Sequence, residues 1–96
     1  MNALATRTIK ETKPLTILQR IGNKDRTAVE DCIDTYGNFI WALARKFTAS
    51  REEAEAAAQE IFNDIWRYAE RADQPQSAES VLIALIARRR LIKYLQ

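Results

Sequence analysis

Apolar residues recur every three or four positions along most of the chain, which is the spacing of one face of an α-helix. The first such segment is short, about two turns, and Gly22-Asn23 favours a helix end directly after it. Its apolar positions are Leu15, Leu18 and Ile21. We therefore expect a short lead-in helix over 15–21.

A second and much longer stripe begins after Asp25, a residue type that favours helix N-caps. Its apolar positions are Val29, Ile33, Tyr36, Ile40, Leu43 and Phe47, with Cys32, Phe39 and Ala44 beside them. The width of this stripe predicts a helix that has neighbours on more than one side and lies at the centre of a bundle.

Ser50 and Glu53 have the spacing of a capping box, so a third helix is expected to start there and to run to about Arg71. One side of this helix is apolar and predicts a core-facing stripe. It contains Ala54, Ala58, Ile61, Ile65 and Ala69, with Phe62 at its margin. The other side is polar or small and is bordered by Trp66. It contains Ala56, Gln59, Glu60, Asn63 and Arg67.

A polar loop over 73–77, which contains a proline, separates the third helix from a last one. Ser77 or Ser80 is expected to cap that helix, which should run to the C-terminus. Its predicted core face is Ile83, Ala84, Ala87, Leu91, Tyr94 and Leu95. A separate ridge is apolar at its start and basic further along. This ridge consists of Leu82, Ile86, Arg89, Lys93 and Gln96, flanked by Arg88 and Arg90.

Length and composition agree with one helical domain. The chain has 96 residues, of which 47% are apolar and 29% are charged, with only two glycines and two prolines. We predict an all-α fold: a compact bundle of about four helices, with two long antiparallel helices and a basic last helix. Residues 1–14 are polar and basic without a helical period, so we predict a flexible tail there and a helical domain over 15–96.

The composition argues against several classes of site. Cys32 is the only cysteine and there is no histidine, so the chain can form no internal disulfide and has few ligands for zinc. The longest apolar run, 81–87, is too short for a membrane span, and no leader segment is visible. We expect a cytoplasmic protein without cofactor, metal or membrane insertion. Catalysis is not expected either, because the carboxylates are spread along helix surfaces and the thiol has no partner base.

Charge is sorted along the chain, although the net charge is only +2. Residues 49–73 carry seven acidic and three basic side chains, whereas 74–96 carry one acidic and four basic ones. Amides beside a tryptophan on the third helix are typical of a surface that docks on a partner helix. The cations of the last helix, with Tyr94 among them, suit phosphates and unpaired bases. Solvated helix faces have similar residues, so spacing alone leaves both interpretations open.

Taken together, the four segments resemble region two of bacterial sigma factors, most of all the extracytoplasmic-function type. Three blocks carry the resemblance, which covers about residues 17–96. They are Gly22, Asp25, Ala28, Val29 and Tyr36; then Arg51-Glu52-Glu53-Ala54-Glu55, Gln59-Glu60, Phe62 and Trp66; and finally Ile86-Ala87-Arg88. The middle block is the most specific, because helix packing alone does not require that combination of residues.

The resemblance implies a transcription initiation factor domain. In such factors the third helix docks on the clamp helices, a coiled coil of the RNA polymerase β′ subunit. The polymerase-binding residues would then be Gln59, Glu60, Asn63 and Trp66. The following loop and the last helix would recognise the melted minus-ten promoter element as non-template single-stranded DNA. The DNA-binding residues would be Arg71, Gln76, Ser77, Arg88, Arg89, Arg90 and Lys93. The resemblance also implies an anti-sigma protein as a partner.

Four positions depart from the family pattern. They are Ala56 in place of an aspartate, Leu82 in place of a tryptophan, Arg89 in place of an asparagine and Lys93 in place of an acidic residue. These departures keep an alternative open: a sigma-like regulatory or decoy protein that binds polymerase or an anti-sigma partner without promoter recognition. A plain helical interaction module, or a helix-turn-helix protein that reads duplex DNA, fits less well, because the segments lack the short turn of that motif.

Overall fold

The computed structural model describes residues 15–71 and 78–95. Within these ranges the chain forms four α-helices and a short 3-10 turn, and no strand. They are α2 (Ile17–Gly22), α3 (Arg26–Phe47), α4 (Arg51–Ala69), α5 (Glu79–Leu91) and the turn η1 (Ile92–Leu95). The predicted all-α bundle is confirmed. The tail predicted over 1–14 lies outside the described residues.

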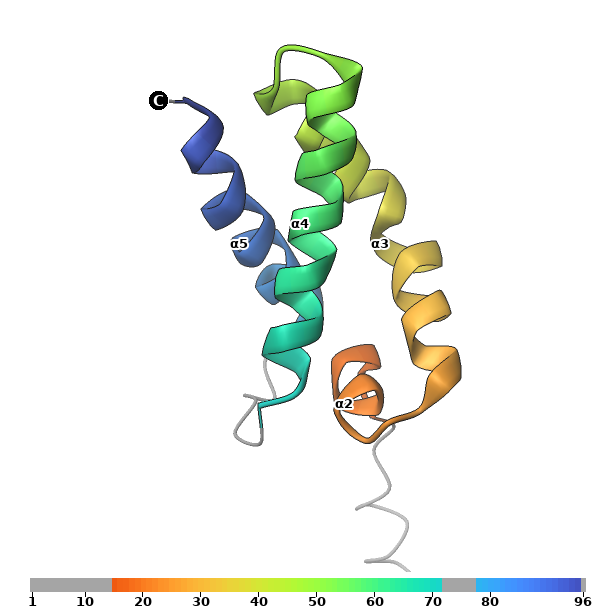
Figure 1. The fold of residues 1–96 in the computed structure, drawn as a ribbon. Helices are drawn as coiled ribbons and strands as arrows, with labels where there is room; N and C mark the ends of the chain where they lie inside the picture. The colour runs from red at the N-terminus through yellow and green to blue at the C-terminus, as the bar shows by residue number, and fades with distance from the viewer. Residues whose placement is uncertain (1–14, 72–77, 96) are drawn as a thin grey trace, which may run out of the picture.

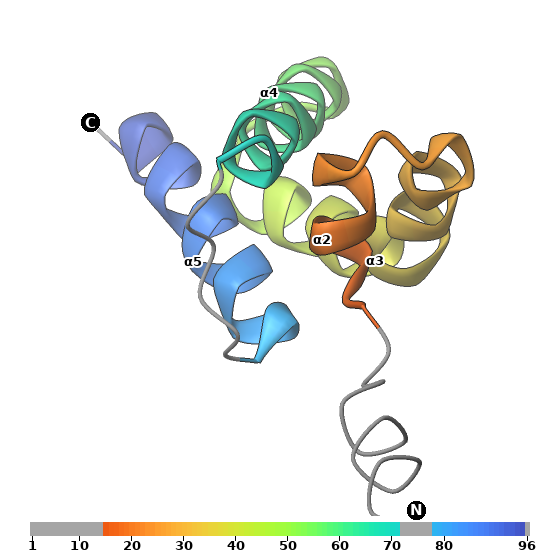
Figure 2. The same ribbon diagram turned by 90° about the horizontal axis from the view of Figure 1, so that it is seen from below.

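The two long helices α3 and α4 run antiparallel, and α5 returns along α4 in the opposite direction (Figure 1). The short helix α2 packs against both α3 and α4, while α5 packs against α4 and α3. Seen from below, α2 lies next to α3, and α5 lies at another edge of the bundle (Figure 2). One side of α4, which contains the exposed Gln59 and Asn63, is left open by these contacts. No helix in the described ranges is long and apolar enough to cross a membrane.

The core is built largely from small side chains. Its fully buried members are Leu18, Cys32, Ile40, Ala44, Ala54, Ala57, Ile61, Ile65, Ala69, Ile83, Ala87 and Leu91. Five of these twelve residues are alanines, and an alanine at a helix crossing lets the two backbones approach closely. Larger side chains, among them Tyr36, Phe62 and Trp66, cover this core from its margins. Added volume at the alanine positions should therefore be poorly tolerated.

The core face of α3 differs from the predicted stripe. Its buried residues lie four or eight positions apart, and they are Ala28, Cys32, Ile40 and Ala44. Ile33 and Phe39, which the period placed in the core, are 46% and 44% exposed. The pattern failed here because it gave weight to bulky residues, whereas the close crossings of α3 use alanine and cysteine. Burial, and next the nearby charge of Glu79, raise the pKa of the Cys32 thiol to about 12.

The N-caps of α3 and α4 are those that the sequence predicts. The Asp25 carboxylate accepts a hydrogen bond from the Thr27 backbone N–H (3.0 Å), and the Ser50 hydroxyl accepts one from the Glu53 N–H (3.1 Å). The return bond of the capping box differs, because the Glu53 carboxylate accepts from the N–H of Ala49 rather than of Ser50. In the buried set of α4, Ala57 takes the place predicted for Ala58, which is only partly buried.

The predicted caps of α5 are wrong. Its N-cap is Ala78, which makes no side-chain hydrogen bond, and Ser80 lies inside the helix. Ser77 lies outside the described residues. At the other end the α-helix stops at Leu91 and continues as the 3-10 turn η1. Leu95, predicted to face the core, is exposed on that turn.

Glu79, the first residue of α5, joins three helices. Its Oε2 accepts a hydrogen bond from the backbone N–H of Leu18 in α2 (2.7 Å), and its Oε1 accepts one from the hydroxyl of Tyr36 in α3 (2.8 Å). Burial, and then this bond to a carboxylate, hold the pKa of Tyr36 well above its ordinary value. The carboxylate fixes the start of α5 against α2 and α3.

A Schellman motif ends α2. The N–H of Asp25 donates to the carbonyl of Arg20 (3.0 Å), and the N–H of Lys24 donates to the carbonyl of Ile21 (2.9 Å). This motif needs one residue in the left-handed region, and Lys24 adopts it with a φ of 68°. Gly22, which the sequence pattern marked as the stop signal, is the last helical residue instead.

We expect Lys24→Gly to raise the free energy of unfolding by about 1 kcal/mol, because glycine adopts the left-handed conformation without a Cβ clash. Urea denaturation should show a higher midpoint with an unchanged slope. Lys24→Ala, which removes the charge and keeps the Cβ, is the control and should show no gain. Equal midpoints for the glycine and alanine variants would contradict this account of the turn.

Candidate functional site

One side of α4 is polar and open. Gln59 and Asn63, one turn apart on the helix, are both exposed. Trp66 borders them and is partly buried, with its ring stacked on that of Phe62 at a centroid distance of 5.5 Å. Both rings also pack against the core, so the indole is held in place while the two amides stay accessible. We refer to Gln59, Asn63 and Trp66 as the amide face.

Glu60 does not belong to this face. Successive helical residues lie about 100° apart, which turns Glu60 away from Gln59 and toward the C-terminal turn. Its carboxylate accepts a hydrogen bond from the hydroxyl of Tyr94 in η1 (2.9 Å). That bond, more than the partial burial of the ring, raises the pKa of Tyr94. The bond between Glu60 and Tyr94 thus joins the middle of α4 to η1.

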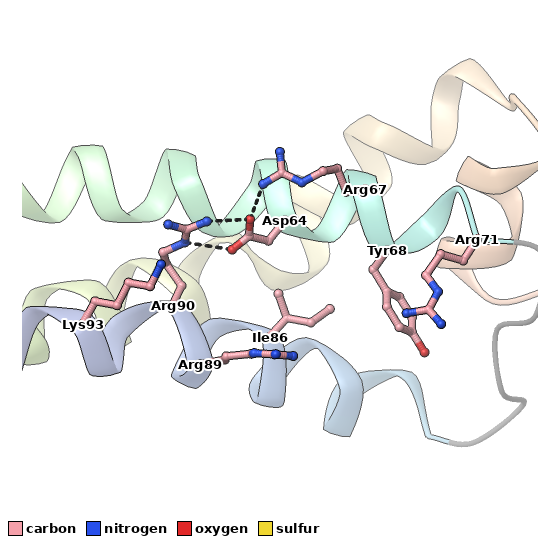
Figure 3. A pocket seen from close by; sticks show the side chains of 8 residues that line it. All are labelled: Asp64, Arg67, Tyr68, Arg71, Ile86, Arg89, Arg90 and Lys93. Atoms are coloured by element: carbon pink, nitrogen blue, oxygen red, sulfur yellow. Dashed lines mark hydrogen bonds and ion pairs between the residues drawn. The ribbon is translucent and has the colours of Figure 1, made fainter.

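A groove lies between α4 and α5 (Figure 3). It encloses about 380 Å³. The residues that line it are Asp64, Arg67, Tyr68 and Arg71 from α4 and its C-terminal end, and Ile86, Arg89, Arg90 and Lys93 from α5 and η1. Five of these eight side chains are cationic and one is acidic, so an anionic ligand is favoured.

The groove also offers apolar and aromatic surface. The guanidinium of Arg71 lies over the ring of Tyr68, 5.7 Å from the ring centroid, and Ile86 points from α5 toward α4 between the cations (Figure 3). An adjoining hollow of about 230 Å³ extends past Leu82 and Leu85. A groove with cations along its length and with rings and methyl groups between them suits a chain of phosphates that carries flat bases.

Asp64 lies at the centre of the cations. Its two carboxylate oxygens accept hydrogen bonds from Nε and Nη2 of Arg90, both at 2.9 Å, and Oδ1 also accepts one from Nη2 of Arg67 at 2.6 Å. The bond to Arg90, and after it the bond to Arg67, hold the pKa of this carboxyl below its usual value despite the opposing effect of burial. Asp64 is therefore ionised at neutral pH.

The family model for sigma-70 region 2 matches residues 32–96, which is well over half of the chain. The chain belongs to the sigma-70 region 2 family. Comparison with curated proteins and with solved structures gave no match. Membership of this family gives the chain a role in transcription initiation and promoter melting, with RNA polymerase and promoter DNA as partners.

The region 2 structure brings together four of the predicted DNA-binding residues. Arg71, Arg89, Arg90 and Lys93 all line the groove, although they come from both ends of the α4–α5 hairpin. Arg88 is exposed but is not among the lining residues, because it lies on the outer side of α5. Gln76 and Ser77 lie outside the described residues. Tyr94, expected near the bases, is bonded to Glu60 instead.

On the α4 side of the region 2 groove, only Arg71 was predicted. Asp64, Arg67 and Tyr68 line it together with Arg71. These four positions have the i, i+3, i+4, i+7 spacing of one helix side, so the sequence does contain the signal. This spacing indicates a groove wall only when α5 is known to pack beside these residues of α4. On an isolated helix the same residues would form a solvated face.

Proposed function

We propose that this region 2 domain uses two separate surfaces in transcription initiation. The amide face binds the clamp helices of the RNA polymerase β′ subunit, and the α4–α5 groove binds the melted minus-ten element as single-stranded DNA. One observation carries the proposal: α4 has exposed amides on one side and a cationic groove on another, with its third side in the core.

The amide face has the properties of a helix-docking surface. Gln59 and Asn63 are exposed and can make directional hydrogen bonds, and the neighbouring Ala56 lets a partner backbone come close. Trp66 supplies a rigid apolar border, since its stacking on Phe62 fixes the ring before a partner binds. Glu60 was expected in this surface from the sequence. We leave it out because Tyr94 already occupies its carboxylate.

The groove has the properties of a single-strand site. A single strand has accessible bases as well as phosphates, and the groove has Tyr68 and Ile86 between its cations. Its guanidinium groups suit phosphate oxygens, which accept bidentate hydrogen bonds. The basic residues Arg89 and Lys93, which depart from the family pattern, lie inside this groove and add to its positive charge. Their charge favours binding of a single strand rather than the loss of promoter recognition in the decoy alternative.

Two sets of variants test the proposal. Gln59→Ala combined with Asn63→Ala should weaken binding to an isolated clamp coiled coil about tenfold, and should leave binding of single-stranded DNA unchanged. Arg89→Ala combined with Lys93→Ala should do the reverse and weaken DNA binding about tenfold or more at low salt. Trp66→Ala is a poorer probe, because the ring also packs against the core.

The pattern of losses decides between the proposed function and the alternatives. If both double variants weaken both partners equally, the two surfaces are not separate and the assignment is wrong. If the wild-type chain binds the clamp but neither single-stranded nor promoter DNA, the regulatory or decoy function is favoured. Equal affinity for duplex and single strand would argue against a role of this groove in holding melted DNA.

A further inference from the structure

The carboxylate of Asp64 is an anion that binds two arginines of the groove. Two of its contacts form a bidentate pair with the Arg90 guanidinium, and the third comes from Arg67 (Figure 3). Arginine presents the same planar fork to a phosphate group. Two of the five groove cations are therefore already bound to an internal anion, while Arg89 and Lys93 form no ion pair with any described residue.

The two arginines differ in how firmly they are held. The Arg90 side chain is 23% exposed and Asp64 is 21% exposed, so their bidentate pair is shielded from water and from salt. Arg67 makes one hydrogen bond to the same carboxylate, and its side chain is 67% exposed. A surface ion pair of that kind contributes little to stability and exchanges partners easily. An incoming phosphate would therefore reach Arg67 first.

We propose that Asp64 is an internal competitor for phosphate, which lowers the affinity of the groove for single-stranded nucleic acid by holding Arg67 and Arg90. This inference rests on the proposed strand-binding function and adds a residue that sets its strength. Weak intrinsic binding has a physical consequence: strand capture then depends on base contacts and on polymerase holding the DNA in place, rather than on charge alone. A purely structural role, in which Asp64 only joins α4 to α5, makes a different prediction.

The test uses the whole chain and a fluorescent oligodeoxythymidine of about 12 nucleotides, with affinity measured over a range of salt concentrations. Asp64→Asn should bind about tenfold more tightly at roughly 0.1 M salt, because it frees arginines to bind phosphates of the strand. Each arginine freed should make the negative slope of log affinity against log salt steeper by about 0.7. Glu55→Gln is the matched control. It removes the same charge from α4 and also releases an arginine, Arg51, but it lies away from the groove. It should change affinity little.

A second comparison begins in the natural background, and this first half does not depend on the stability of Asp64→Asn. In the natural background Arg67→Ala should lower affinity only about twofold, whereas Arg89→Ala should lower it about fivefold, since Arg67 is already paired. In the Asp64→Asn background the loss from Arg67→Ala should rise to that of Arg89→Ala, which a double-mutant cycle measures.

The outcomes separate this inference from the function on which it rests. If the wild-type chain binds the oligonucleotide and Asp64→Asn gains no more than Glu55→Gln, the competitor role is wrong and the groove assignment stands. The same holds if Arg67→Ala and Arg89→Ala lose equally in the natural background. If no variant binds at any salt concentration, both the groove assignment and the competitor role are wrong.

Discussion

Replacing Glu79 with alanine is expected to lower the free energy of unfolding by about 3 kcal/mol, the largest loss that we predict for a residue outside the apolar core. The change removes an acceptor shared by the Leu18 N–H and the Tyr36 hydroxyl and leaves both donors unsatisfied in a partly buried position. Each donor bond to a charged acceptor contributes roughly 1.5 kcal/mol or more. The start of α5 has no side-chain cap to compensate.

Urea denaturation followed by far-UV circular dichroism measures this loss. Glu79→Gln keeps the length of the side chain and one acceptor oxygen, so it should cost less than alanine. Glu30→Ala is the control, because it removes an exposed acid from α3 that makes no hydrogen bond with a described residue. A loss from Glu79→Ala no greater than that from Glu30→Ala would show that the three-helix junction contributes nothing to stability.

Replacing Ala57 with leucine should cost about 2–3 kcal/mol, because the position is fully buried and the added carbons have no space. Ala56→Leu, one residue earlier in the same helix, is the control. Its side chain is exposed, and its intrinsic helix propensity changes by the same amount, so its free energy of unfolding should change by less than about 0.5 kcal/mol. Thermal unfolding of the two variants gives the difference directly.

This pair of variants also tests the packing of α4. The sequence pattern placed Ala58 in the core, and the structure places Ala57 there. Ala58→Leu should therefore fall between the other two variants. An order in which Ala58→Leu is the most damaging would support the sequence pattern and contradict the structure.

The sequence predicts the elements of this fold better than it predicts their faces. Helix caps depend on neighbours within a few residues, so Asp25 and Ser50 could be recognised directly. The core face depends on how closely two helices approach, and here small residues such as Cys32 are buried while the larger Ile33 is exposed. Hydrophobicity alone does not distinguish these cases, because a close crossing selects for size. The start of α5 was missed for a related reason, since it is held by Glu79, which bonds to helices that are distant in sequence.

The same distinction applies to the site. Ile86 and Arg89 in α5 and Lys93 in η1 line the same wall of the groove, and the helical period alone brought them together. The opposite wall of the groove, with Asp64 and Arg67, depends on which side of α4 faces α5, and that is a property of the tertiary fold. The resemblance to region two predicts two surfaces in outline. It did not show that Glu60 is bonded to Tyr94, or that an acid lies among the groove cations.

The burial of Cys32 has a practical consequence for experiments on this domain. It is the only thiol of the chain, it is fully buried, and its pKa of about 12 keeps it almost entirely protonated at neutral pH. A cysteine introduced at an exposed position, for example in place of Asn63 or Arg88, would be the one group to react with a maleimide dye. Fluorescent reporters can thus be attached to the outer sides of α4 or α5 without first removing the native thiol from the core.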